Sequence, residues 1–282
     1  MPRRYHAGRG ARHLLALALA FALTTHGRRP YCPAVARVPR EGELRARIVE
    51  ICRRMYAREL IAAGDGNVSA WLDEERVLCT PTGFNKGYLR EEDLVVVDLR
   101  GRRLRGVHQP SSEFRMHSAA YEERPDVHAV VHGHPPITVA LALAGVDLSG
   151  CVLSETCLLL GPILTAPYTT PTTDEVPRVL RPFFRQANAV VMDRHGAITL
   201  GRDLDEAYNR MEAMEHASKI THAARMLGPV SALPPVEVDK LEALAARLGI
   251  PRPPDKATPA APASAAGDDA IVDLVVRRLR GG

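Results

Sequence analysis

Residues 127–134 of the chain read Val-His-Ala-Val-Val-His-Gly-His, an apolar run that ends in two closely spaced histidines. A short apolar run of this kind is typical of a buried β-strand. Side chains two residues apart lie on the same face of a strand, so His132 and His134 should point to one side. The pair could share one metal ion, although two surface or core histidines would give the same pattern.

A third candidate ligand is His195, which is followed by Gly196 in a turn between strand-like runs at 189–192 and 197–200. A catalytic zinc ion usually has three protein ligands and one open position. The glycine allows tight backbone passage, and the flanking strand would hold the imidazole rigidly. The predicted metal ligands are therefore His132, His134 and His195.

Small polar residues gather in three further places. Ser111, Ser112 and Glu113 open a predicted helix that runs to about residue 124, and the amides at a helix amino terminus favour an anion. Turns at 66–69 (Gly-Asn-Val-Ser) and 80–83 (Thr-Pro-Thr-Gly) add more donors. Together the three could cradle a phosphate group, although each alone is more typical of a helix cap or an ordinary turn.

Helical and strand-like segments alternate irregularly through about 190 residues, which fits a single domain. Helical patterns cover 44–63, 204–227 and 238–248, and strand-like runs cover 76–79 and 94–99. The expected architecture is an α/β sandwich, and a hydrophobic share of 46% is ample for its core. The sequence contains no internal repeat, no glycine-rich dinucleotide fingerprint and no Walker-type phosphate loop.

Charge and cysteine usage exclude several classes of protein. The formal charge of +4 arises from interspersed basic and acidic residues, without the basic patch that binds nucleic acid. Five cysteines without a Cys-x-x-Cys pair argue against a disulfide framework and against a cysteine zinc site. A reducing compartment, the cytoplasm, fits this composition best.

Three segments fall outside the predicted domain, which spans 41–249. Residues 1–40 carry arginines before an apolar run at 14–23, a pattern shared by a short signal sequence, a start codon assigned too far upstream and a disordered leader. The run is too short to span a bilayer. Residues 250–267 form a Pro/Ala-rich linker, and residues 268–282 form an amphipathic helix with one apolar stripe.

Five motifs occur between residues 44 and 227 in the order Gly-Asn-Val-Ser, Thr-Pro-Thr-Gly, Pro-Ser-Ser-Glu, His-Gly-His-Pro and Arg-His-Gly. This ordered set resembles the class II aldolase/adducin family and, within it, the L-fuculose-phosphate aldolase branch. A set in fixed order is far more specific than any one of its motifs. The resemblance implies an α/β/α sandwich around a mainly antiparallel sheet, one zinc ion per subunit, and a homotetramer with active sites at the subunit interfaces.

The resemblance also assigns roles to individual residues. His132, His134 and His195 match the zinc ligands of the family. Glu113 matches the carboxylate that sits by the metal and acts as base and acid. The family's phosphate contacts match Gly66, Asn67, Thr82, Gly83, Ser111 and Ser112.

The implied reaction is the reversible cleavage of a ketose 1-phosphate, of the L-fuculose 1-phosphate type, into dihydroxyacetone phosphate and an aldehyde such as lactaldehyde. Pentulose-phosphate 4-epimerases, sugar-phosphate dehydratases and the metal-free adducin module share the family and are the alternatives. Glutamate at position 113 favours an aldolase over an epimerase, which typically carries aspartate there. One departure concerns the family's proton-donating tyrosine, whose position falls near Ser154 or Glu155.

The terminal segment 268–282 resembles the encapsulation peptides that carry enzymes into bacterial microcompartments. A helix of about a dozen residues is marginal alone in water, so it needs a partner surface, here a shell protein. The alternative is a helix that folds back on its own tetramer or frays. The lack of aromatic anchors on its apolar face argues against a membrane surface.

Overall fold

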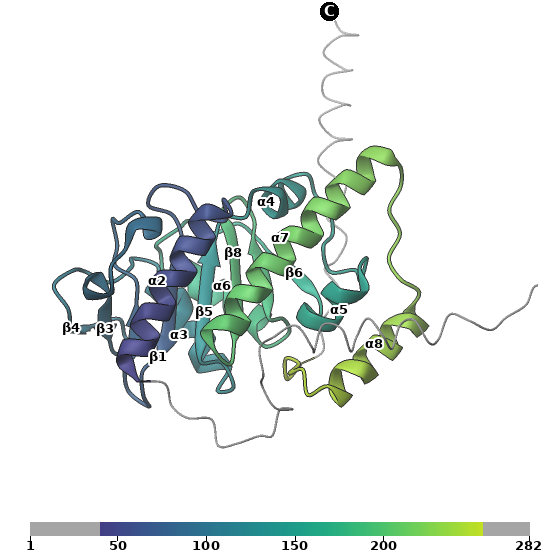
Figure 1. The fold of residues 1–282 in the computed structure, drawn as a ribbon. Coiled ribbons are helices and arrows are strands. Elements are labelled where there is room, and N and C mark those ends of the chain that lie inside the picture. Colours follow the sequence, from purple (N-terminus) through teal and green to yellow (C-terminus); the bar gives the residue numbers. More distant parts are fainter. Residues whose placement is uncertain (1–39, 256–282) are drawn as a thin grey trace, which may run out of the picture. The chain divides into compact units, whose positions relative to one another are not determined.

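The computed structural model describes residues 40–255, and within them eight strands form one sheet (Figure 1). The strands are β1 (Asn67–Trp71), β2 (Val77–Cys79), β3 (Val95–Val97), β4 (Arg103–Arg105), β5 (Ala129–Gly133), β6 (Ile163–Ala166), β7 (Ala189–Met192) and β8 (Gly196–Gly201). Their order is β4-β3-β2-β1-β5-β8-β7-β6, and only β6 and β7 pair in parallel. The predicted α/β fold around a mainly antiparallel sheet is confirmed.

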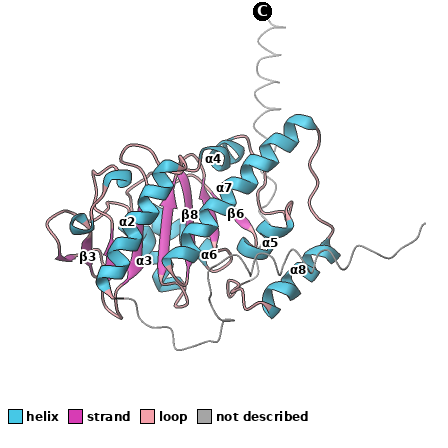
Figure 2. Ribbon diagram, in the orientation of Figure 1, coloured by secondary structure: helices cyan, strands magenta, loops and turns pink. Residues whose placement is uncertain are grey.

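Helices enclose this sheet on both faces (Figure 2). The described α-helices are α2 (Glu41–Ala57), α3 (Phe114–Glu123), α4 (Pro136–Leu143), α5 (Ser154–Leu160), α6 (Glu175–Phe184), α7 (Leu204–Leu227) and α8 (Pro235–Arg247). Helices α2 and α7 contribute to the core on one face, and α3 and α6 to the core on the other. Val191 of β7 belongs to the first core and Val190 to the second. A strand buried on both faces needs apolar residues throughout, which explains its continuous apolar run.

The sequence patterns predicted most helices and strands but misplaced the ends of several. Helix α7 has the predicted bounds, and the Asp203 side chain accepts a hydrogen bond from the Glu206 amide at 2.7 Å. The first helix stops at Ala57 instead of residue 63, because the chain turns at Glu59 with a φ of 59°. Helix α3 has Glu113 as its N-cap, and the hydroxyl oxygen of Ser111 accepts a hydrogen bond from the Glu113 amide at 3.2 Å.

Residues 1–39 and 256–282, which hold the predicted leader, most of the linker and the amphipathic helix, lie outside the described residues. The predicted domain limits therefore stay a prediction. Within residues 40–255, no helix is both long enough and apolar enough to cross a membrane.

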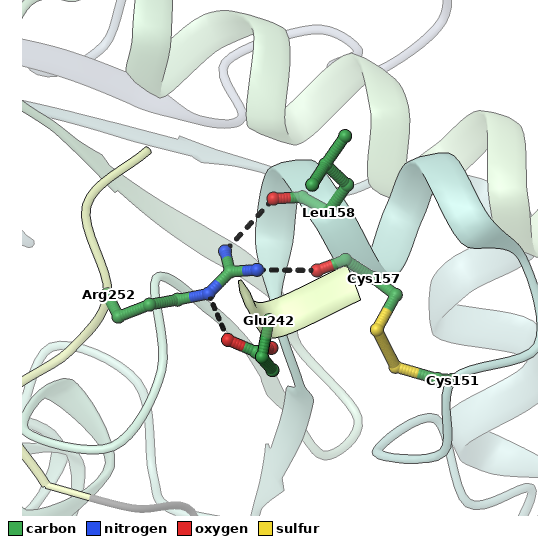
Figure 3. The surroundings of a disulfide bond; sticks show 5 residues. All are labelled: Cys151, Cys157, Leu158, Glu242 and Arg252. Atoms are coloured by element: carbon green, nitrogen blue, oxygen red, sulfur yellow. Dashed lines mark hydrogen bonds and ion pairs between the residues drawn. A yellow bond between two sulfur atoms is a disulfide. The ribbon is translucent and has the colours of Figure 1, made fainter. Parts of the chain in front are cut away.

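The cysteines were expected to build no disulfide framework, and among the described residues the structure holds one local disulfide. Cys151 and Cys157 are joined, with their Cα atoms 5.4 Å apart (Figure 3). Helix α5 begins between them at Ser154 and brings the two cysteines within bonding reach. An odd cysteine count carries no signal for so local a pair, and the reducing compartment inferred from that count loses its basis.

Arg252 ties the chain that follows α8 to the end of α5 (Figure 3). Its guanidinium donates to the carbonyl oxygens of Leu158 and Cys157, each at 3.0 Å, and to Glu242 Oε2 at 2.7 Å. The Cys157 carbonyl oxygen also accepts from the Gly161 amide at 3.1 Å, and a cation beside the last carbonyl groups of a helix suits the helix dipole. The arginine therefore anchors the last described residues to the domain.

Replacing Arg252 by alanine should lower the free energy of unfolding by about 1–2 kcal/mol, because two carbonyl groups and a carboxylate lose a charged donor that is only partly exposed. Urea unfolding followed by circular dichroism measures this change. Arg247→Ala, an exposed arginine of α8, is the matched control and should leave the midpoint unchanged. Equal midpoints for the two variants would show that the anchor contributes nothing.

Candidate active site

The three histidines of the predicted metal site meet where β5 and β8 pair. His132 lies in β5, His134 follows the end of that strand, and His195 lies in the turn between β7 and β8. The register places Gly133 of β5 opposite Ala197 of β8, so the turn lies beside the end of β5. One ligand nitrogen from each histidine lies within 4.8 Å of the others. The structure thus brings together residues that are more than sixty positions apart in the sequence.

Two glycines make this approach possible. A Cβ atom at Gly196 would lie 2.5 Å from the carbonyl oxygen of Gly133 and 2.6 Å from Cδ2 of His134. A Cβ atom at Gly133 would lie 2.8 Å from the carbonyl oxygen of Leu60. Such distances are shorter than any ordinary van der Waals contact. Glycine at both positions is therefore needed for the backbones to pass this closely.

The imidazoles are oriented with Nε2 toward one another. Nδ1 of His132 donates to the Ala197 carbonyl oxygen at 2.9 Å, which leaves the lone pair on Nε2. Nε2 of His134 lies 3.2 Å from Nε2 of His132, and its Nδ1 lies 3.5 Å from the carboxylate of Asp65. Burial lowers the pKa of His132 to about 3 and also lowers the pKa of His134. Both rings are therefore neutral at neutral pH, as a metal ligand must be.

Glu113 faces the cluster from the start of α3. Its Oε1 lies 3.1 Å from Nε2 of His195, and its Oε2 lies 3.5 Å from Nε2 of His132. The side-chain amide of Asn67 donates to Oε2 at 2.8 Å. Burial opposes ionisation, but the hydrogen bonds that the carboxylate accepts from His195 and Asn67 outweigh it and hold the pKa of Glu113 well below its usual range. The carboxylate is therefore ionised beside the histidines.

This donor set fits a divalent metal ion that favours imidazole ligands. Two neutral ring nitrogens that face each other at 3.2 Å are suited to share a cation, and an ionised carboxylate completes the set. Nδ1 of His195 is buried and has no hydrogen-bond partner among residues 40–255. The ring is therefore held by hydrogen bonding only through Nε2, the nitrogen that faces the cluster. The three histidines and Glu113 are the residues that would hold the ion.

The two loops with small donors lie side by side next to Glu113. An isolated β-bridge between Pro81 and Pro110 pairs the loop of residues 80–83 with the loop that leads into α3. Thr82 donates its amide to the Gln109 carbonyl oxygen at 3.0 Å. This pairing brings together four of the predicted phosphate contacts, of which Ser111 is half-buried and the others are exposed: Thr82, Gly83, Ser111 and Ser112.

Gly66 and Asn67 lie deeper than the other predicted phosphate contacts. The prediction that residues 66–69 form a turn is wrong, because residues 67–69 belong to β1. Gly66 has a φ of 70°, and a Cβ atom there would lie 2.8 Å from the carbonyl oxygen of His132. Asn67 is only 3% exposed, and its amide group bonds Glu113. Their contact with a phosphate group stays a prediction.

Several polar residues around the site were not predicted from the sequence. Asp65 contacts His134, and His117 and Tyr121 follow Glu113 along α3. Residues 113, 117 and 121 are spaced at i, i+4 and i+8, which places Glu113, His117 and Tyr121 on one side of the helix. That periodicity was the available signal for His117 and Tyr121.

Comparison with known proteins identifies the family. Residues 46–222 match the model described as Class II Aldolase and Adducin N-terminal domain. This match covers more than half of the chain, and the chain belongs to this family. Its members include aldolases, a decarboxylase and a dehydratase, so membership alone does not fix the substrate.

Individual relatives support the same assignment. An L-fuculose phosphate aldolase from Methanococcus vannielii is 33% identical over 174 residues, which cover 62% of this chain and 93% of the relative. A 3-oxo-tetronate 4-phosphate decarboxylase from Haemophilus influenzae is 32% identical over 177 residues, 61% of this chain and 84% of the relative. The solved structure of YgbL from Escherichia coli, for which an aldolase, epimerase or decarboxylase activity has been suggested, superposes with a TM-score of 0.66 at 29% identity and covers 71% of this chain and 98% of its own.

His195→Ala should abolish stoichiometric zinc binding, because it removes the only ligand contributed by the turn between β7 and β8. Metal analysis of the purified protein after dialysis against zinc measures the bound ion. The matched control is His128→Ala, an exposed histidine just before β5, which should keep one zinc per subunit. Full zinc occupancy in His195→Ala would remove this residue from the ligand set.

Proposed function

We propose that the chain is a zinc-dependent aldolase that reversibly cleaves a ketose 1-phosphate, of the L-fuculose 1-phosphate type, into dihydroxyacetone phosphate and an aldehyde such as lactaldehyde. The observation that carries this proposal is the position of Glu113, whose Oε1 lies 3.1 Å from His195 in the histidine cluster. The loops that carry Thr82 and Ser112 adjoin the same carboxylate. A proton-transfer group, a set of metal ligands and donors for a phosphate group therefore share one site.

The residues of this site suit carbon–carbon cleavage beside a carbonyl group. A zinc ion held by His132, His134 and His195 would polarise that carbonyl as a Lewis acid. In the condensation direction, ionised Glu113 accepts a proton from the carbon next to the carbonyl, and in the cleavage direction it returns the proton to that carbon. The exposed donors of the paired loops would hold the phosphate and so fix the distance between that carbon and Glu113.

A second candidate function is the decarboxylation of a 3-oxo acid phosphate. The relative from Haemophilus influenzae is named for this reaction, and Ser154 and Glu155 occupy the region where the aldolase tyrosine is expected. Loss of carbon dioxide leaves its electron pair on the carbon beside the carbonyl, as aldol cleavage does. Decarboxylation, unlike aldol cleavage, removes no proton from a hydroxyl group of the substrate. It therefore needs no tyrosine for that step.

The two functions are separated by their second product. Purified protein with zinc is mixed in turn with L-fuculose 1-phosphate, L-rhamnulose 1-phosphate and 3-oxo-tetronate 4-phosphate. Dihydroxyacetone phosphate is the expected product in each productive case, accompanied by an aldehyde from an aldolase substrate or by carbon dioxide from the 3-oxo acid. Release of carbon dioxide alone would replace the aldolase proposal by the decarboxylase. Conversion of ribulose 5-phosphate without cleavage would support an epimerase instead.

Glu113→Gln should lower kcat by about a hundredfold to ten-thousandfold, because an amide cannot take or return the proton. The fold and most of the bound zinc should remain, since the amide keeps the shape of the side chain. Glu122→Gln, at an exposed position of the same helix, is the control and should turn over normally. A kcat near the wild-type value in Glu113→Gln would refute the acid–base assignment.

We further propose a homotetramer whose terminal segment, residues 268–282, docks on the shell of a bacterial microcompartment. The support is the amphipathic pattern of that segment and the advantage of confining a reactive aldehyde. A fluorescent protein fused to residues 250–282 should form shell-dependent foci in cells that make the cognate shell. Diffuse fluorescence without co-purification would contradict docking and leave the aldolase proposal intact.

A further inference from the structure

A buried chain of hydrogen bonds runs from Glu113 into the core between α3 and β1. Asn67 Nδ2 donates to Glu113 Oε2 at 2.8 Å, and Nε2 of His117 is bonded to the Asn67 side-chain oxygen. Ser69 Oγ lies 2.7 Å from Nδ1 of His117 and 2.7 Å from the hydroxyl oxygen of Tyr121. Apart from Glu113, no side chain in this hydrogen-bond network is more than 4% exposed.

Regular secondary structure supplies every member. Asn67 and Ser69 are two residues apart on β1, and His117 and Tyr121 are four residues apart on α3, so each pair occupies one face of its element. Polar groups buried in a core are unfavourable unless all their hydrogen bonds are made. Here each polar side chain has its hydrogen-bond partner within the same buried network.

The order of donors and acceptors along the chain has one solution. An ionised carboxylate only accepts, so Asn67 must present its NH₂ group to Glu113 and its oxygen to His117. Nε2 of His117 must then donate. Burial lowers the pKa of His117 to about 3, so the ring is neutral and its Nδ1 accepts from Ser69. Ser69 has one hydrogen to give, so its oxygen accepts from Tyr121.

We propose that His117, fixed by Ser69 and Tyr121, is a positioning residue that holds the Asn67 amide in the one orientation that donates to Glu113. Without the donor on His117, the amide could rotate and present its oxygen to the carboxylate. Two acceptors would then face each other, and Glu113 would move away from the histidine cluster. This inference rests on the proposed acid–base role of Glu113 and names the residues that keep its carboxylate in place.

The proton position on His117 tests the inference without any assay of activity. Nitrogen-15 spectra of protein labelled at histidine distinguish a protonated Nε2 from a protonated Nδ1, and the His117→Gln spectrum identifies the His117 signals by their loss. The expected result, in metal-free and zinc-loaded protein, is a neutral ring with the proton on Nε2. A proton on Nδ1, or a charged ring, would overturn the proposal whether or not the protein proves to be an aldolase.

Kinetics of paired variants supply the second test. His117→Leu should lower kcat about tenfold to a hundredfold with little change in KM, the range typical when a residue that orients an active-site group is lost. His117→Gln should recover most of kcat, because its amide can donate to Asn67 and accept from Ser69. Ser118→Ala, the control, loses a hydrogen bond to the Leu99 carbonyl oxygen from the same helix and should lower only the melting temperature.

A purely structural role would change the melting temperature of His117→Leu while kcat per folded molecule stayed at the wild-type value, and that outcome would overturn the proposal. Ser69→Ala covers the case in which His117→Leu does not fold, because it removes only the bond to Nδ1. It should give a smaller loss of kcat, and an unchanged kcat would be equally decisive. If the wild-type protein cleaves none of the substrates, the proposed function fails, and the proton position alone decides the inference.

Discussion

The close approach of β8 to β5 at Gly196 is the constraint on which the candidate site depends. A side chain at this position would occupy space that the imidazole rings of His132 and His134 now fill. The same strand β5 pairs on its other edge with β1, where Asn67 lies opposite His132. The register of three neighbouring strands therefore sets the positions of the histidines and of the amide that contacts Glu113. A one-residue slip in either pairing would turn these side chains to the other face.

The sequence predicted the parts of the site that are local. Two histidines at strand spacing and a third beside a glycine are visible within a few residues, and the structure brings them together. The role of residues 67–69 could not be predicted in this way. Asn67 and Ser69 are polar and resemble turn residues, and they are buried in a strand only because α3 presents His117 and Tyr121 to them. Burial that depends on a partner about fifty residues away leaves no local signal.

The cysteines show a similar limit on what composition reveals. Their number and spacing argued against a disulfide framework, yet Cys151, which precedes α5, is bonded to Cys157 in the first turn of that helix. Arg252 holds the other end of the same short helix. The segment that carries Ser154 and Glu155, where the family tyrosine is expected, is therefore fixed at both ends.

The charges around the cluster explain why it suits a divalent cation. His132 is kept neutral by burial, whereas Glu113 is kept ionised by the hydrogen bonds it accepts. Asp65 adds a second carboxylate beside His134, and the buried ammonium group of Lys86 interacts electrostatically with both Asp65 and Glu113. One ammonium group beside two carboxylates still favours a cation among the neutral imidazoles. A bound dication would meet that preference, and an amide held in one orientation keeps Glu113 available to it.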